Sequence, residues 1–189
     1  MYEKILVPLD GSKTAEAVLP NVVRIARESK AKVVLFTVDA PGLNGGRGGS
    51  TWSDMGNALA TMGKPDAAMK AYLDSAESML AGLEVKATTA TAIGDAAEAI
   101  LNYATTYECD LIAMSTRGRS ALRRGLMGSV TDAVVRASTI PVLAVGPNSV
   151  DGKDLDGAIR SIAVPLDGSE MAETILPHVE KLASLLSLE

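Results

Sequence analysis

Apolar and polar positions divide the chain into two kinds of segment. Short, nearly continuous apolar runs occur at residues 5–9, 33–38, 111–114 and 142–145. Runs of this length without alternation are typical of strands that are covered on both faces, as in a parallel sheet. Residues 85–91 form a more polar run of strand length, which favours a strand at the edge of the same sheet.

The stretches between these runs have the period of helices. After the first run, apolar residues recur on one helical face, with Ser12 as a candidate N-cap and Pro20 at a bend or near the first turn. The other predicted helices cover residues 66–83, the stretch that follows the capping-box residues Asp95 and Glu98, and about 129–137. Strands that alternate with helices predict right-handed βαβ units and an α/β fold with a doubly wound parallel sheet.

An internal repeat divides the chain into units. Residues 7–12, Val-Pro-Leu-Asp-Gly-Ser, recur identically at 164–169, and the surrounding residues align without a gap. Residues 147–158 are rich in Gly and Asp and have the composition of a linker. We therefore expect one complete domain over residues 1–146, and the first strand and helix of a second repeat over 159–189. A glycine-rich insertion at 41–57 lacks a phosphate-loop pattern and is interpreted as a loop.

The composition narrows the classes of function. Hydrophobic residues make up 47% and charged residues 22% of the chain, which predicts a folded domain. The net charge of −5 argues against non-specific binding of nucleic acid, which requires a surplus of Lys and Arg. A lone cysteine, Cys109, and a lone histidine, His178, exclude a disulfide framework within the chain and most metal sites. Without a signal peptide or a membrane-length apolar run, we expect a cytoplasmic protein that does not contact membranes.

The residues around the strand at 111–114 form the most informative motif. After Ser115 and Gly118, nine intervening residues lead to Gly128 and Ser129 at the start of a predicted helix. A helix N-terminus at the carboxyl end of a parallel strand attracts phosphate, and glycines allow close backbone approach and positive φ. The amides from Gly128 to Val130 are expected to point outward. Four arginines lie in the same loop: Arg117, Arg119, Arg123 and Arg124.

These motifs resemble the universal stress protein family over residues 1–146, and again over 159–189. The nucleotide-binding signature of that family is Gly-x2-Gly-x9-Gly followed by Ser or Thr. The chain matches it at Gly118, Gly128 and Ser129 and departs from it at Ser115, where the signature has glycine. A requirement for positive φ at that position would cost stability.

The resemblance implies a fold, a ligand and a set of contacts. It implies an open five-stranded sheet in the order 3-2-1-4-5, of the adenine-nucleotide alpha-hydrolase-like type, that binds ATP, possibly with Mg²⁺. By the same resemblance, Asp10 would lie near the ribose or adenine, Val38 and Met114 near the base, and the residues from 128 to 131 near the phosphates. The implied binding residues are Pro8, Leu9, Asp10, Val38, Met114, Ser115, Arg117, Gly118, Gly128, Ser129, Val130 and Thr131.

Structural alternatives stand beside each of these roles. Asp10 can cap the helix that follows it, and Gly128 with Ser129 can be an ordinary N-cap. Met114 can belong to the core, and the arginines can form a solvated loop. For the whole protein we expect a nucleotide-binding module for regulation or stress tolerance, with no catalytic residues. The alternatives are a slow ATPase and an assembly module that has lost nucleotide binding. The apolar run at 142–145 favours a homodimer. The partial repeat is expected either to dock on an exposed apolar surface or to exchange with a neighbouring chain in a domain-swapped oligomer.

Overall fold

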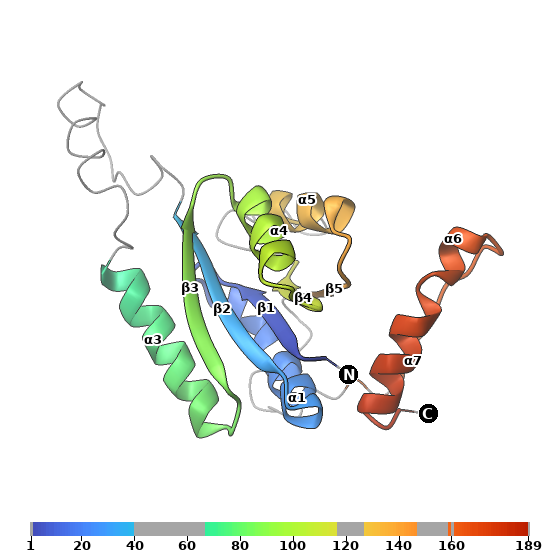
Figure 1. Ribbon diagram of the computed structural model, residues 1–189, viewed down its shortest axis with the longest axis horizontal. Helices are drawn as coiled ribbons and strands as arrows, with labels where there is room; N and C mark the ends of the chain where they lie inside the picture. Colours follow the sequence, from blue (N-terminus) through green and yellow to red (C-terminus); the bar gives the residue numbers. More distant parts are fainter. Residues whose placement is uncertain (1, 40–66, 117–126, 147–158, 160, 189) are drawn as a thin grey trace.

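A parallel sheet with strand order β3-β2-β1-β4-β5 forms the centre of the molecule (Figure 1). The computed structural model describes residues 2–39, 67–116, 127–146, 159 and 161–188. The strands are β1 (Lys4–Pro8), β2 (Lys32–Asp39), β3 (Ala87–Ile93), β4 (Leu111–Ser115) and β5 (Val142–Val145). The α/β class, the parallel sheet and the expected strand order are confirmed.

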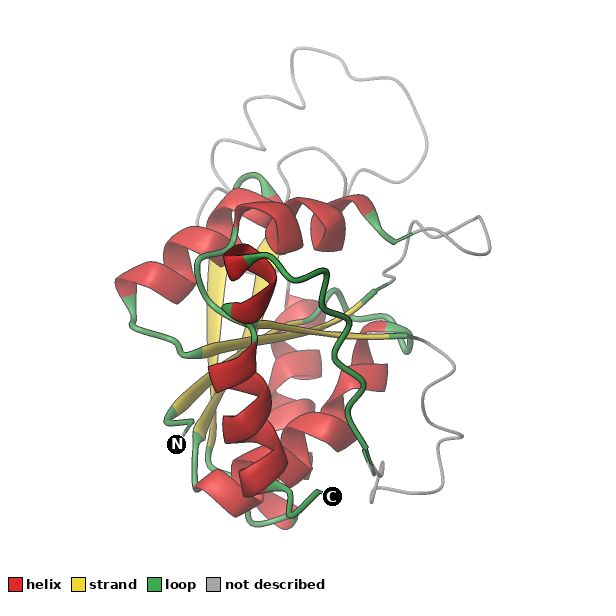
Figure 2. Cartoon of the chain, turned by 90° about the vertical axis from the view of Figure 1, so that its right-hand side faces the viewer, coloured by secondary structure: helices red, strands yellow, loops and turns green. Residues whose placement is uncertain are grey.

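Helices cover both faces of the sheet, above and below the strands in Figure 2. In chain order they are the 3-10 helix η1 (Ala15–Val18), α1 (Leu19–Ser29), α3 (Ala67–Gly82), α4 (Ala96–Thr106), α5 (Ser129–Ala137), α6 (Glu170–Glu173) and α7 (Leu176–Leu185). Helices α1 and α3 pack on one face, and α4 and α5 pack on the other. The helix at 129–137 has the bounds that its sequence predicts.

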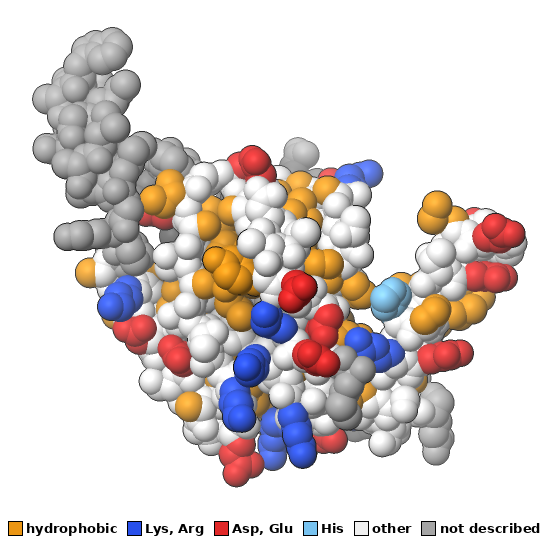
Figure 3. Space-filling view, in the orientation of Figure 1, with side chains coloured by type: hydrophobic (Ala, Val, Ile, Leu, Met, Phe, Trp, Pro, Cys, Tyr) orange, Lys and Arg blue, Asp and Glu red, His pale blue; other side chains and the backbone are white. Residues whose placement is uncertain are grey.

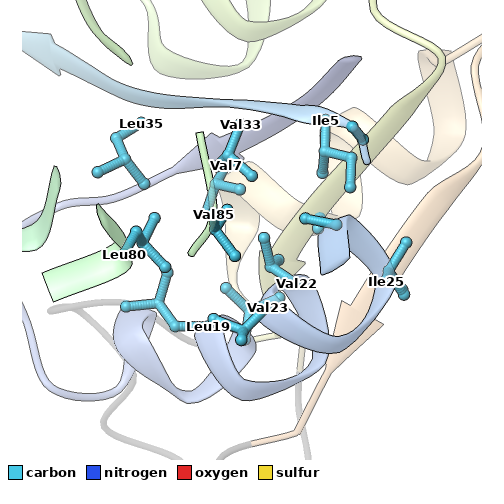
Figure 4. Packing of buried hydrophobic residues seen from close by; sticks show 14 of the residues in the cluster. Ile5, Val7, Leu19, Val22, Val23, Ile25, Val33, Leu35, Leu80 and Val85 are labelled. Carbon is cyan, nitrogen blue, oxygen red and sulfur yellow. The ribbon is translucent and has the colours of Figure 1, made fainter. Parts of the chain in front are cut away.

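Strand β1 is buried on both faces of the sheet. Ile5, Leu6 and Val7 are each 0% exposed. Because side chains alternate along a strand, Ile5 and Val7 point towards α1 and α3, as Figure 4 shows, whereas Leu6 packs on the α4 side. The continuous apolar run at the start of the sequence therefore reflects the central place of this strand.

The helix after β1 begins in two steps. Residues Ala15–Val18 form η1, and α1 follows directly with Pro20 in its first turn. Proline has no amide hydrogen to donate to the preceding turn, so an α-helix tolerates it only near its start. The sequence left two places open for Pro20, a bend or the first turn of the helix, and the structure has it in the first turn of α1. The Ser12 hydroxyl accepts a hydrogen bond from the Ala15 amide at 3.1 Å, but the N-cap position of η1 is Thr14, not Ser12 as the sequence predicts.

Strand β3 lies at the edge of the sheet, as its polar sequence predicts, but it begins two residues later than expected. The Val85 amide donates to the Leu80 carbonyl at 3.0 Å, which ties this residue to the end of α3. After β3, the Asp95 carboxylate accepts the Glu98 amide at 3.0 Å and so caps α4. The capping role of Asp95 is confirmed.

Residues 159–188, here called the C-terminal arm, differ from the expectation for a second strand and helix. Residues 161–168 belong to no strand, and helical structure begins only at α6. A strand requires a hydrogen-bonded neighbour, and the place between β2 and β4 is filled by β1. In the described residues the repeated segment therefore forms no strand, and the second domain stays a prediction.

The arm is attached to the rest of the chain through its two ends. The Arg24 guanidinium, on α1, donates to the Ile159 carbonyl at 3.0 Å and to the Leu186 carbonyl at 3.2 Å. The Lys181 ammonium lies 4.1 Å from the centre of the Tyr2 ring, within the range of a cation–π interaction. Leu186 is buried against the core, whereas α6 extends away from it at the right of Figure 1.

Replacement of Leu6 by alanine tests how strongly the sheet depends on β1. Leu6→Ala removes a side chain that is 0% exposed, and we expect it to lower the free energy of unfolding by about 2–5 kcal/mol in urea denaturation. Val135→Ala is the control, because this side chain on α5 is 43% exposed and its truncation should cost less than about 0.5 kcal/mol. Equal losses in both variants would contradict the burial of β1.

Candidate functional site

Strands β1 and β4 end side by side at the carboxyl edge of the sheet, and a polar turn follows β1. Gly11 has a φ of +78°, which allows the chain to turn towards η1. An Asp10 carboxylate oxygen accepts the Ser12 amide at 3.0 Å and the Ser12 hydroxyl at 2.6 Å. These bonds hold the Asp10 carboxylate at the end of β1, so Asp10 stabilises its own turn and does not cap a helix directly.

The N-terminus of α5 lies after β4 at the same edge. Gly128 is its N-cap, with a φ of −63°, so the positive φ considered from the sequence does not occur there. The Gly128 amide donates to the Thr116 carbonyl at 2.7 Å and is not available to a ligand, which corrects the expectation that it points outward. The first bond inside the helix runs from Asp132 to Gly128 at 2.9 Å. The amides from Ser129 to Thr131 therefore have no acceptor within the helix.

Ser115 and Thr131 join the end of β4 to α5. The Thr131 hydroxyl donates to the Ser115 carbonyl at 2.9 Å, and the two residues are 3% and 5% exposed. This hydroxyl is thus bonded within the protein, whereas the resemblance places Thr131 near the phosphates. Ser115 is the last residue of β4 and is not among the residues with positive φ. Serine therefore meets no backbone strain at the position where the signature has glycine.

The other expected binding residues lie along the same edge with different degrees of burial. Leu9 is 3% exposed, and its amide donates to the Phe36 carbonyl at 2.8 Å, which extends the pairing of β1 with β2. Met114 is 5% exposed and belongs to the same buried cluster as Phe36, as the core alternative predicts. Pro8 and Val38 are half-buried at the ends of β1 and β2. Side chains of this kind can form an apolar wall but offer few polar contacts.

Several expectations lie outside the described residues. These are Arg117 and Gly118 of the signature, the further arginines Arg119, Arg123 and Arg124, the insertion at 41–57 and the linker at 147–158. Among the described residues of α5, Ser129 is exposed and Val130 is half-buried against the α4 side of the core. The described part of the site therefore consists of the Asp10 turn, the end of β4 and the first turn of α5.

Sequence reasoning missed Thr116. Its amide donates to the Val145 carbonyl at 2.8 Å, and its carbonyl accepts the Gly128 amide. Thr116 thereby fixes both ends of the loop that separates β4 from α5. The apolar run of β4 ends at Met114, two residues before Thr116. Thr116 could have been found only by assuming that the pairing of this strand with the strand at 142–145 continues for those two residues.

The thiol of Cys109, a side chain of a type that can act as a nucleophile, lies away from the carboxyl edge of the sheet. Cys109 precedes β4 at the opposite edge of the sheet, and burial is the main cause that raises the pKa of its thiol. A raised pKa makes this thiol a poor nucleophile near neutral pH.

In the described part of the chain, no three His, Cys, Asp or Glu side chains are placed to hold a metal ion. None of the described helices is long and apolar enough to cross a membrane.

The sequence profile of the universal stress protein family matches residues 1–146. Universal stress protein MJ0531 of Methanocaldococcus jannaschii is 32% identical over 146 residues, which cover 77% of this chain and 82% of that protein. Universal stress protein YxiE of Bacillus subtilis is 30% identical over 153 residues, covering 77% of this chain and 99% of that one.

Solved structures show a similar fold. A universal stress protein solved in complex with cAMP has a TM-score of 0.56 and 24% identity, covering 77% of this chain and 98% of that one. A universal stress protein from Archaeoglobus fulgidus has a TM-score of 0.74 and 20% identity. It matches 98% of this chain, which in turn spans 64% of that longer protein. At these identities the likeness concerns the fold alone.

The hydrogen bond from Thr131 to Ser115 can be tested by two substitutions. Thr131→Val keeps the shape of the side chain but leaves a buried carbonyl without this donor, so we expect a loss of about 1–3 kcal/mol in the free energy of unfolding. Thr131→Ser retains the hydroxyl and should lose less. A Thr131→Val variant as stable as the wild type, in the same urea titration, would contradict the structural role of this bond.

Proposed function

The chain belongs to the universal stress protein family, and from this premise we propose that it binds ATP at the carboxyl edge of its sheet. The observation that carries the proposal is the first turn of α5, where three successive amides have no acceptor within the helix. Such amides, with the positive end of the helix dipole, favour a phosphate group. The bound nucleotide would act as a regulatory ligand in stress tolerance.

The ends of the neighbouring strands are suited to the nucleoside. The Asp10 carboxylate is fixed in position by Ser12, and carboxylates commonly accept hydrogen bonds from a ribose or an adenine amino group. The half-buried side chain of Val38 would supply part of an apolar wall for the base. Strand β1 lies between β2 and β4, so these groups and the phosphate-binding turn lie along one continuous edge. We extend the proposal to the signature residues Arg117 and Gly118.

The chain's own residues supply little for chemistry at phosphorus. Phosphoryl transfer requires positioned cations and a group that orients the nucleophile. The described residues offer no cluster of metal ligands, so any Mg²⁺ would arrive with the triphosphate and be held mainly by it. We therefore propose a binding protein with at most slow hydrolysis, acting through nucleotide-dependent conformation and partner binding. Placement in the cytoplasm belongs to the same proposal.

Two alternatives differ in what they predict for purified protein. A slow ATPase would release ADP from ATP over time. An assembly module without nucleotide binding would carry no adenine nucleotide after purification and would show no heat on titration. Ser115 is not among the residues with positive φ, so the departure from the family signature brings no backbone strain, which supports nucleotide binding over the assembly module. Homodimerisation along the exposed edge of β5, as the apolar sequence favours, is a further part of the proposal.

Gly128→Val tests the phosphate site. A branched side chain at the N-cap would block the approach of a phosphate to the amides of α5, so we expect calorimetry to detect no binding of ATP. The fold should persist, because Gly128 has an ordinary φ that valine can adopt. Gly82→Val is the matched control, since the new Cβ there meets no heavy atom within 4 Å. Equal affinity for ATP in both variants would show that the site is elsewhere.

A further inference from the structure

Strand β3 presents an open row of peptide groups at one edge of the sheet. At its start, the Lys86 carbonyl accepts the Val33 amide at 2.8 Å, and beyond its end the Gly94 amide donates to the Asp39 carbonyl at 3.1 Å. In a parallel strand the amide and the carbonyl of one residue point to the same side, and the side alternates along the chain. The even-numbered residues of β3 therefore bond to β2, and the odd-numbered residues turn their amides and carbonyls away from the sheet.

This edge lacks the features that usually prevent a second chain from pairing with it. Residues 87–93 read Ala-Thr-Thr-Ala-Thr-Ala-Ile, without a charge or a proline. Thr89 and Thr91 are exposed, and Ile93 is 49% exposed. Natural proteins protect edge strands with charged residues, prolines or bulges, because an uncharged and regular edge pairs readily. The edge of β3 is therefore open to a further strand.

Three lysines lie in one row at the amino end of the sheet. Lys4 of β1 is in register with Lys32 of β2, and the register of β2 with β3, extended by one residue, puts Lys86 next to Lys32. The Lys4 ammonium donates to the Tyr107 carbonyl at 2.6 Å. Lys32 and Lys86 are exposed and form no ion pair among the described residues. Figure 3 shows Lys and Arg side chains gathered at this lower end of the sheet. Neighbouring like charges repel, so a carboxylate from another chain would stabilise this end of the edge.

The other end of the same edge is acidic. Asp39 is the last residue of β2, and Asp95 is exposed where β3 leads into α4. One Asp95 oxygen accepts the Glu98 amide at 3.0 Å, which holds this carboxylate at the end of the strand. Glu84 belongs to the turn after α3, because its amide donates to the Ala81 carbonyl at 3.0 Å. A second copy that pairs in the antiparallel direction therefore brings the lysines of each chain to the aspartates of the other.

We propose that β3 pairs with β3 of a second copy of this chain, as antiparallel strands related by a two-fold axis at Ala90. In this register Thr89 lies opposite Thr91 of the second copy, and Ala87 lies opposite Ile93. All odd-numbered residues from 87 to 93 then exchange hydrogen bonds with the other chain. The contact uses every peptide group that β3 turns away from β2.

The two neighbouring registers use fewer of these groups. An axis at Thr89 would require the Val85 amide, which already donates to the Leu80 carbonyl at 3.0 Å. An axis at Thr91 would pair Ala87 with the N-cap of α4, where the strand has ended. The central register avoids both conflicts.

Side chains across the proposed contact are complementary. On the face that α1 and α3 share, threonines pair at the centre, and the exposed Ile93 covers the small Ala87 of the other copy. On the α4 face, the two Ala90 side chains lie opposite each other at the axis. Lys86 lies within one residue of Asp95 of the second copy, and the two-fold symmetry repeats this pair of opposite charges.

The contact is compatible with a homodimer through β5, because β3 and β5 lie at opposite edges of the sheet. Each of the two contacts joins the same surface of two copies and by itself stops at a dimer. Both together would join copies in a chain in which β3 contacts and β5 contacts alternate. Loss of the β3 contact would leave the β5 contact in place.

Cysteine cross-linking tests the pairing and its register. Opposite residues that exchange no hydrogen bonds have Cβ atoms about 4.5–5.5 Å apart, which a disulfide can join after a small shift. Ala90→Cys places a cysteine opposite its own copy, so we expect mild oxidation to give a disulfide-linked dimer on a non-reducing gel. The wild type gives the background, because its single cysteine, Cys109, is buried.

Thr88→Cys is the matched control for this variant. Position 88 is exposed and lies on the same face of β3, but in the proposed register it faces position 92 of the other copy. Thr88→Cys alone should therefore remain unlinked. Its mixture with Ala92→Cys should give a linked heterodimer, which tests the same register at a second place.

Thr91→Pro tests whether the contact uses the outward peptide groups. Proline removes an outward amide and none of the bonds to β2, so an edge strand can accept it there. In the Ala90→Cys variant this change should abolish the disulfide. In the otherwise wild-type chain, species larger than a dimer should disappear in multi-angle light scattering. Circular dichroism checks that the variant is folded.

Lys86→Glu tests the pairing of charges. The introduced carboxylate would face Asp95 of the second copy, so disulfide formation in the Ala90→Cys variant should slow about two- to fivefold. Lys30→Glu changes an exposed lysine outside β3 and should leave the rate unchanged.

Three results would overturn the proposal. The first is equal cross-linking of Ala90→Cys and Thr88→Cys, because it would show that the register is not fixed. The second is a disulfide in Ala90→Cys that survives Thr91→Pro in a folded variant. The third is the absence of linked dimer both in Ala90→Cys and in the mixture of Thr88→Cys with Ala92→Cys.

Discussion

Burial of β1 between two parallel neighbours is the constraint on which the rest of the structure depends. Its apolar side chains are 0% exposed on both faces, and its backbone is bonded to β2 on one side and β4 on the other. A strand in this place brings the ends of three strands to one edge of the sheet. The Asp10 turn and the first turn of α5 are adjacent for that reason, although more than a hundred residues separate them. In the arm, residues 164–169 repeat residues 7–12 identically but form no strand, because no strand of the described structure lies beside them.

The fold could be read largely from periodicity. Continuous apolar runs identified the central strands, and the polar run before the capping residue Asp95 identified the edge strand. The exact start of β3 could not be predicted, because Val85 has the sequence of a strand but is bonded to the last turn of α3. The sequence also could not show that residues 161–168, which have the pattern of a strand, form none in the described structure. Strand formation depends on a partner, and a sequence pattern reports only the ability to pair.

The candidate site could be predicted in position but not in detail. The spacing from Gly118 to Ser129 located the start of α5, and the resemblance to the family placed Asp10 near the ligand. Hydrogen bonding decides which groups of these segments remain available to a ligand. The Gly128 amide and the Thr131 hydroxyl are both bonded within the protein, and Thr116 receives a role that no pattern indicated. Such bonds depend on the register between β4 and β5, which the sequence does not specify.

The most direct measurement of the central claim is backbone amide hydrogen exchange with and without ATP. Binding at the carboxyl edge should slow exchange of the amides from Ser129 to Thr131 and of the turn after β1, because these amides would donate to the phosphates or be covered by the nucleoside. Exchange in α7, whose Lys181 lies beside Tyr2 at the amino end of β1, should not change. Unchanged exchange in the first turn of α5 at saturating ATP, or protection confined to other segments, would contradict the account.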